Sequence, residues 1–309
     1  MNKYTKTKIL GKGAYGNVFK AKDELGKEIY AMKEFIIKNE KDAKNEGIPP
    51  TAIREVYLLK ELNHINIEQL IDVLHTPKNF TLVFEFIDTD LKKIIDNKKS
   101  NHEKLSSKEI KSYLYQLLKG VACMHKHKII HRDLKPGNLL ITKDNILKIA
   151  DFGLARCYSL PIRNFTYNVV TFCYRAPDIF LGNTDYTTDI DMWSIGCIFA
   201  EMNLMIPLFK TTENLMVNKI FGALGPITEE TYSKYEFLPL WEEEFKSIKG
   251  NGLRERMKDL DDVGFDLLMK FLQLDPDKRI SAEDALKHPY FNDLDETTKE
   301  LYINEDEGK

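Results

Sequence analysis

Cysteine is scarce in this chain, which has only four cysteines among 309 residues and no C-x-x-C pair. A disulfide framework needs a dense set of cysteines and a zinc site needs closely paired ones, so the spacing favours neither. Reduced thiols are typical of proteins of the cytoplasm and nucleus, which is where we expect this protein. The four residues are Cys123, Cys157, Cys173 and Cys197.

Long apolar runs are also lacking, and so is a strong excess of either charge. No stretch approaches the length needed to span a membrane, and the N-terminus lacks the apolar core of a signal peptide. The formal net charge is only −3, which does not indicate a protein that binds nucleic acid or a membrane surface through its overall charge. We therefore expect neither of these among its partners.

Hydrophobic periodicity predicts strands and one strong helix in the first part of the chain. Pro49 and Pro50 precede apolar residues at helical spacing, which predicts a helix over residues 51–62. Short apolar segments rich in β-branched and aromatic residues predict strands at 18–21, 29–33 and 81–86.

From about residue 91 the pattern becomes mostly helical. Ser106 and Glu109 have the spacing of a capping box, and the apolar residues after them predict one face of a helix. Residues 191–202 predict an apolar, buried helix, and Ser281 is typical of a helix start. Together, the two parts predict an α+β fold with a β-rich N-terminal part and a larger helical one.

Residues 11–18 read G-K-G-A-Y-G-N-V, which matches the pattern G-x-G-x-x-G-x-V. A dinucleotide-binding turn would need a helix directly after the third glycine, whereas residues 18–21 predict a strand. A glycine-rich hairpin lets backbone N–H groups approach phosphate oxygens without interference from Cβ atoms. Lys33 then lies on a later strand, and Glu55 in the predicted helix is its candidate partner. The alternative is that both are ordinary surface charges.

Residues 131–138 read H-R-D-L-K-P-G-N, and D-F-G follows at 151–153. Phosphoryl transfer from Mg-ATP needs such a set of groups. Asp133 can accept the proton of a hydroxyl, and Lys135 can offset the charge of the moving phosphoryl group. Asn138 and Asp151 can hold Mg²⁺. The two motifs together resemble those of protein kinases.

From residue 4 to about residue 291, the chain resembles the cyclin-dependent kinases, which are serine/threonine kinases of the CMGC group. The most specific stretch is G-I-P-P-T-A-I-R-E at 47–55, and residues 83–93 and 169–178 resemble the hinge and the end of the activation segment. The resemblance implies a bilobal kinase fold of the α+β class. Its expected parts are an N-lobe at 1–86, a C-lobe at 87–292 and an acidic tail at 293–309.

The resemblance also implies ATP and Mg²⁺ as cofactors and a set of nucleotide contacts. Glu85 and Ile87 would bond adenine through their backbones, and Asp90 would meet the ribose. Leu140 would lie under the base, and Phe84 would close the rear of the pocket. The other implied residues are Leu10, Gly11, Gly13, Gly16, Val18 and Ala31 around the nucleotide, and Thr171 in the catalytic set.

A partner surface is predicted on the helix that carries Glu55. At about 100° per residue, Ile53 lies roughly 160° from Glu55, so Ile53, with Val56 beside it, would point away from the catalytic face. The resemblance implies a cyclin or cyclin-like subunit there; the alternative is packing on neighbouring strands. We expect the helix to be rotated outward in the isolated chain, with Lys33 unpaired until the partner binds.

The resemblance implies two regulatory sites and a substrate preference. Arg54, Arg132 and Arg156 would converge around a phosphate on Thr166, while Tyr15 matches an inhibitory phosphotyrosine. Proline after the target serine or threonine would be preferred in protein substrates, because of the positions of Val170 and Arg175. The chain also departs from the family: Asp178 replaces the glutamate expected to pair with an arginine, here Arg279.

Two alternatives stay open. The first is a partner-independent kinase of the mitogen-activated type, although such kinases separate their activating threonine and tyrosine by one residue, whereas Thr166 and Tyr167 are adjacent. The second is a catalytically inert scaffold with a kinase fold, although every catalytic position is filled.

Overall fold

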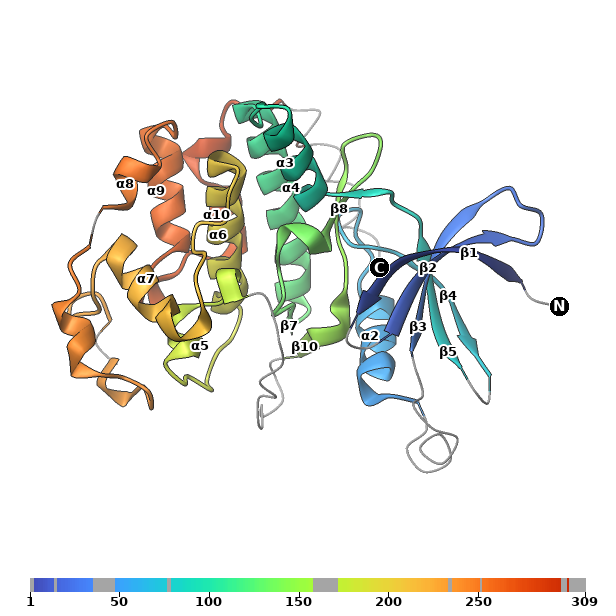
Figure 1. Cartoon of the computed structure of the whole chain (residues 1–309), viewed down its shortest axis with the longest axis horizontal. Coiled ribbons are helices and arrows are strands. Elements are labelled where there is room, and N and C mark those ends of the chain that lie inside the picture. Colours follow the sequence, from blue (N-terminus) through green and yellow to red (C-terminus); the bar gives the residue numbers. More distant parts are fainter. Residues whose placement is uncertain are drawn as a thin grey trace.

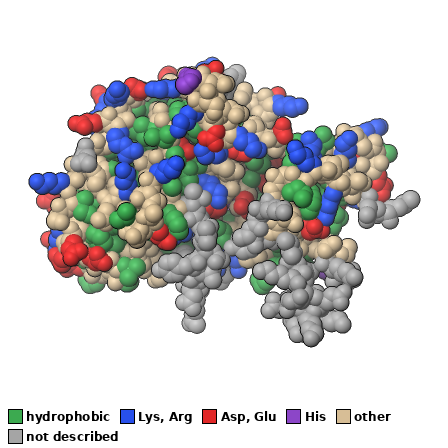
Figure 2. Space-filling model, viewed as in Figure 1, with side chains coloured by type: hydrophobic (Ala, Val, Ile, Leu, Met, Phe, Trp, Pro, Cys, Tyr) green, Lys and Arg blue, Asp and Glu red, His purple; other side chains and the backbone are tan. Residues whose placement is uncertain are grey.

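The computed structural model describes residues 3–13, 16–35, 48–76, 79–157, 172–232, 235–250, 252–295 and 299. Two parts lie side by side, a β-sheet with one helix and a larger part made mostly of helices (Figure 1). Among the described residues, no helix has both the length and the apolar character needed to cross a membrane. Figure 2 shows side chains of both charges on the visible face, in keeping with the small net charge.

The N-terminal part is an antiparallel sheet in the order β1-β2-β3-β5-β4. Strand β5 lies inside the sheet and has the sequence F-T-L-V-F-E, which is buried except at its last residue. The predicted strand segments all fall in strands, with ends shifted by a few residues. The strands are β1 (Tyr4–Gly13), β2 (Gly16–Asp23), β3 (Ile29–Phe35), β4 (Leu70–His75) and β5 (Phe80–Glu85).

Helix α2 (Pro50–Glu61) lies beside this sheet, one residue from the predicted bounds at each end. It begins with Pro50 because the first helical N–H needs no partner within the helix. Its buried residues recur at helical spacing and form one face, which consists of Ala52, Glu55, Leu58 and Leu59.

The larger part is built around two long helices, α4 (Ser107–Lys126) and α6 (Asp189–Leu204). The predicted capping box starts α4: Glu109 N–H donates to Ser106 Oγ at 3.2 Å, and Ser106 N–H donates to Glu109 Oε2 at 2.7 Å. Every residue of α6 from 191 to 202 is buried, as predicted. The other helices are α3 (Leu91–Ser100), α5 (Pro177–Phe180), α7 (Met216–Leu224), α8 (Leu253–Arg256), α9 (Asp262–Phe271) and α10 (Ala282–Leu286).

Two small sheets complete the described structure. In the larger of them Leu140 is the central residue, because Asp90 stands opposite it on one side and Lys148 on the other. The chain just before β4 joins this sheet through a bridge between Ile67 and Ile149. The strands are β6 (Thr89–Asp90), β8 (Leu139–Ile141) and β9 (Leu147–Ile149), with β7 (Ile129–Ile130) and β10 (Arg156–Cys157) in the second sheet.

The predicted pair of Asp178 and Arg279 is present, and both side chains are fully buried. The shorter acid therefore still reaches the arginine. The arrangement of a β-rich part followed by a mostly helical part confirms the predicted α+β class. The predicted boundaries at residues 86 and 292 stay predictions.

Candidate functional site

Lys33 of β3 contacts two carboxylates from distant parts of the chain. Its Nζ atom lies 2.7 and 2.9 Å from the two oxygens of Glu55 on α2, and 2.8 Å from Asp151 Oδ1. Burial alone would lower the pKa of Lys33, but the charges of Asp151 and Glu55 raise it above its usual value. Lys33 therefore stays cationic and is positioned to bind an anionic group.

The closed pair corrects the expectation that α2 is rotated outward in the isolated chain. Glu55 is only 1% exposed and contacts Lys33 without any second chain. A buried face of leucines holds the helix inward, since Leu58 and Leu59 belong to the main hydrophobic core. Val56, which was predicted to point away from the catalytic face beside Ile53, is half-buried against that core.

Asp133, Lys135 and Asn138 form a compact cluster after β7. Lys135 Nζ donates to Asp133 Oδ2 at 2.7 Å, and the amide nitrogen of Asn138 donates to the same oxygen at 3.1 Å. Asn138 also holds the backbone carbonyl of Asp133, at 2.8 Å. The cluster fixes the Asp133 carboxylate through Oδ2, and among the described residues no hydrogen bond holds Oδ1, which can accept one from a hydroxyl group.

Asp151 lies next to this cluster, because Ala150 N–H donates to the carbonyl of Asn138 at 2.9 Å. Its backbone is left-handed, with φ of 64°, and its pKa is held below the usual range by Lys33 although burial would raise it. The amide nitrogen of Asn138 contacts Asp133, so the amide oxygen Oδ1 of Asn138 can serve as a cation ligand together with the carboxylate of Asp151. Two oxygen donors fit a divalent cation that takes its remaining ligands from phosphates and water.

Residues 131–138 form a loop that we call the catalytic loop. The residues that support it were not predicted from the sequence. Asp191 of α6 is 1% exposed and accepts the backbone N–H groups of His131 and Arg132, each at 2.9 Å. His125 Nε2 lies 3.0 Å from the same carboxylate. A charged residue inside a mostly apolar, buried helix was the available signal, because such a charge needs partners.

His131 links the catalytic loop to the segment with Asp151. Its Nε2 atom lies 3.0 Å from the carbonyl oxygen of Ala150, and its ring packs edge-on against Phe152 at 5.1 Å between centroids. The two predicted motifs are therefore in direct contact.

The residues expected around adenine come from both parts of the structure. Phe84 is 4% exposed at the end of β5, and Leu140 is half-buried in β8. Asp90 caps α3, because its Oδ1 accepts Lys93 N–H at 2.9 Å. Ile87 is half-buried between β5 and β6, and Glu85 is described below. The remaining predicted residues lie on the first three strands: Leu10, Gly11 and Gly13 on β1, Gly16 and Val18 on β2, and Ala31 on β3.

Glu68 is a further acid near Lys33 that the sequence did not single out. Burial raises the pKa of Glu68 to about 8. The charge of Lys33 lowers this pKa, whereas the neighbouring carboxylates of Glu55, Glu85 and Asp151 raise it further. Glu68 is therefore largely protonated at neutral pH.

The three predicted arginines come together. Burial and the charges of Arg132 and Arg54 lower the pKa of Arg156. Among the described residues, Arg156 Nε is buried and has no hydrogen-bond partner. Arg132 donates to the carbonyl of Leu154 at 2.6 Å and to the hydroxyl of Tyr186 at 3.0 Å. Like charges around an unmatched N–H form a site that favours an anion.

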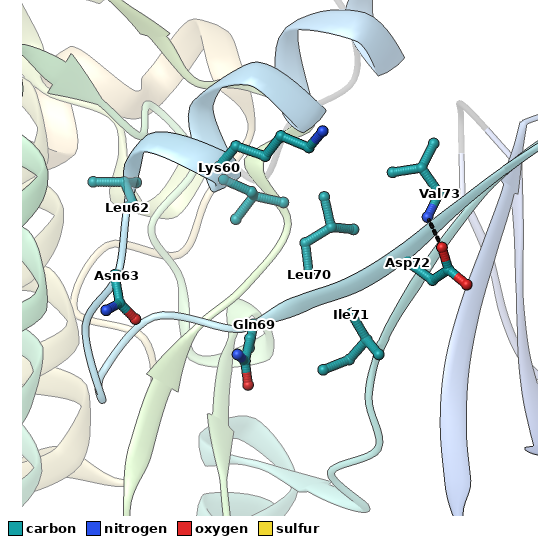
Figure 3. A pocket seen from close by; sticks show the side chains of 9 residues that line it. Lys60, Leu62, Asn63, Gln69, Leu70, Ile71, Asp72 and Val73 are labelled. Atoms are coloured by element: carbon teal, nitrogen blue, oxygen red, sulfur yellow. Dashed lines mark hydrogen bonds between the residues drawn. The ribbon is translucent and has the colours of Figure 1, made fainter.

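The outer face of α2 exposes apolar side chains. Ile53 is 54% exposed and Tyr57, one turn later, is 59% exposed. Lys60 continues this face and lines a surface pocket of about 570 Å³ between the end of α2 and β4 (Figure 3). Leu70 and Ile71 extend from β4 beside that pocket. None of the predicted site residues lines it, so the pocket is separate from the Lys33 cluster.

Four predicted residues lie outside the described part of the chain: Tyr15, Thr166, Val170 and Thr171. Arg175 is described, and its guanidinium stacks on the rings of Phe172 and Phe180 at 5.1 and 5.4 Å. It also lies 3.5 Å from Glu213. These contacts fix Arg175 beside the end of the activation segment.

Comparison with protein families agrees with this geometry. A description of the protein kinase domain matches residues 4–291, which is nearly the whole chain. The prediction of a protein kinase is therefore confirmed, and with it the use of ATP and a divalent metal. With the lysine, the two carboxylates and the catalytic cluster in place, the chain belongs to the protein kinase domain family.

Proposed function

We propose that this protein is a cyclin-dependent serine/threonine kinase that transfers the γ-phosphate of Mg-ATP to sites followed by proline. The single observation that supports a partner subunit is the exposed apolar face of α2, which Ile53 and Tyr57 form. The buried face of the same helix holds Glu55. Apolar side chains gathered on such a face favour a covering protein, and the sequence of this helix resembles that of cyclin-binding kinases.

The catalytic roles follow from the chemistry of each group. Asp133 accepts the proton of the substrate hydroxyl, and Lys135 offsets charge on the phosphoryl group. Lys33, fixed by Glu55, binds the nucleotide phosphates. Asn138 and Asp151 would hold Mg²⁺, which would supply positive charge against the phosphates.

Activation by phosphate on Thr166 is the second element of the proposal. Within the described part of the chain the buried Nε of Arg156 lacks a partner and lies next to Arg54 and Arg132, which supports an anion at this place. A phosphate carries about −2 charge and three acceptor oxygens, so it can bond several guanidinium groups at once.

The partner is tested with the purified chain and a panel of cyclin-like proteins. Ile53→Asp should abolish both partner binding, measured by calorimetry, and the activation that the partner gives. Val263→Asp is a matched control, because Val263 is 45% exposed on α9 and far along the chain from α2. Loss of activity in Ile53→Asp with unchanged cyclin affinity would contradict the proposal.

Substrate preference is tested on a peptide array with the activated enzyme. Proline directly after the serine or threonine should raise phosphorylation strongly, and a basic residue two positions later should add to it. In the resembled family, the carbonyl of the residue at Val170 turns toward the arginine, so a substrate N–H there would lack an acceptor. An array without proline preference would exclude this specificity.

A partner-independent kinase of the mitogen-activated type is the second candidate. The observation that favours it is the closed contact between Lys33 and Glu55 in a single chain. Full activity of the chain alone, after phosphorylation of Thr166 and Tyr167, would support this alternative over the first.

A further inference from the structure

Lys148 and Glu85 form an ion pair where the five-stranded sheet meets the larger part. Lys148 Nζ lies 2.8 Å from Glu85 Oε1, and the two side chains are only 14% and 27% exposed. Glu85 ends β5, whereas Lys148 lies in the middle of β9. In the described part of the chain, Lys148 has no other ion pair, so Glu85 alone balances its charge.

The same carboxylate oxygen reaches a third segment. Glu85 Oε1 accepts the N–H of Gln69 at 3.0 Å, directly before β4. The preceding residue, Glu68, donates its own N–H to the carbonyl of Ile149 at 2.9 Å. The end of β5, the start of β4 and strand β9 are thus tied together through two adjacent residues.

Both ends of the pair adjoin the proposed adenine contacts. Lys148 stands opposite Leu140 in the β8–β9 register, and Leu140 is the residue placed under the base. Glu85 itself offers its backbone to the edge of the base. The separation of β9 from the end of β5 therefore sets the distance between the surface under adenine and the backbone groups beside it.

The geometry points to Glu85 and Lys148 as positioning residues that hold the adenine site at its working width. This inference rests on the proposed adenine contacts of Glu85, Ile87 and Leu140. The pair acts through the backbone of β5 and β9, and its side chains do not touch the nucleotide. Its effect should therefore fall on ATP affinity and leave proton transfer at Asp133 unchanged.

Lys148→Met keeps most of the apolar stem and removes the charge. We expect the KM for ATP to rise about tenfold, while kcat at saturating ATP stays within about twofold and the KM for a peptide substrate is unchanged. Glu85→Gln should give a similar shift. The double variant should be no worse than either single variant, because one interaction is lost in all three. Lys148→Arg should keep near wild-type ATP affinity.

Lys111→Met is the matched control. Lys111 is 12% exposed and lies 2.7 Å from Asp293, so the variant breaks an equally close pair in the helical part. Its KM for ATP should not change. If Lys148→Met does not fold, Glu85→Gln and Lys148→Arg still test the pair.

The inference would be overturned by an unchanged KM for ATP in active Lys148→Met or Glu85→Gln, or by additive effects in the double variant. A fall in kcat that tracks the loss of thermal stability, with the KM for ATP constant, would show a merely structural pair and overturn it as well. Failure of the wild-type protein to phosphorylate any peptide would instead contradict the proposed function.

Discussion

The Oδ1 atom of Asp191 accepts the backbone N–H of Arg132 at 2.9 Å, across 59 residues of sequence. Arg132 has φ of 69°, a left-handed conformation that a side chain with a Cβ adopts at a cost. The buried carboxylate holds this conformation, and its hydrogen bonds, foremost with His125, keep its pKa below the usual range although burial would raise it. The position of Asp133 therefore depends on a residue that never meets substrate.

Asp191→Asn should damage both activity and stability. The amide has one acceptor oxygen where the carboxylate has two, so one buried N–H loses its partner, and unfolding free energy should fall by roughly 1–3 kcal/mol. Displacement of the catalytic loop should lower kcat by about a hundredfold. Steady-state kinetics and denaturant unfolding measure the two effects. Exposed Asp144→Asn is the control, and equal kcat values in the two variants would exclude the supporting role.

Asp133→Asn and Lys33→Arg should each abolish most phosphoryl transfer while ATP binding is partly retained. The first removes the proton acceptor, and the loss of general-base catalysis is about 10²–10⁴-fold. The second displaces the phosphates, because a guanidinium cannot occupy the place of an ammonium held by two carboxylates. Single-turnover phosphorylation and nucleotide titration separate these effects. Near wild-type turnover of either variant in the activated enzyme would show that the role assigned to the substituted residue is wrong.

Thr166→Ala should lower activity strongly and change ATP affinity little. The phosphate would bond Arg54, Arg132 and Arg156 together and so order the surface on which a protein substrate lies. Thr166→Glu should rescue poorly, since one carboxylate cannot serve three guanidinium groups. Peptide kinetics with the fully phosphorylated wild type as reference measure the loss. Full activity of the partner-bound alanine variant would refute this role for Thr166.

Glu68 should make stability depend on pH. Its pKa is raised to about 8 in the folded protein, so between the ordinary glutamate pKa and pH 8 only the unfolded chain gives up this proton. Wild-type stability relative to Glu68→Gln should therefore fall as pH rises from 5 to 8, by roughly 2–4 kcal/mol, and stay level above that. Urea unfolding at several pH values tests this. A constant difference between the two proteins would show that Glu68 has an ordinary pKa.

Much of the fold was predictable because local signals and tertiary packing agree. Pro50 starts α2 within one residue of the prediction, and the capping box of Ser106 and Glu109 marks the start of α4. The apolar stretch in α6 is fully buried because helices of that composition lie in a core.

The site was predictable where a motif carries its own chemistry and less so where geometry decides. The contact of Lys33 with Glu55 followed from the pattern, but the inward position of α2 did not, because it depends on how leucines of the helix pack in the core. Asp191 and Lys148 belong to no short motif. Their partners lie 59 or more residues away in sequence, and only the folded chain brings them together.

The arginine cluster has a thermodynamic consequence for the unphosphorylated protein. The folded chain gathers Arg54, Arg132 and Arg156, and the buried Nε of Arg156 has no partner among the described residues, so we expect the folded chain to bind anions that the unfolded chain does not bind. Anion binding is then linked to folding, and each tenfold rise in a saturating anion adds about 1.4 kcal/mol to the free energy of unfolding. The melting temperature of the unmodified protein should therefore depend on the anion in the buffer, and it should be higher in sulfate or phosphate than in chloride of equal ionic strength.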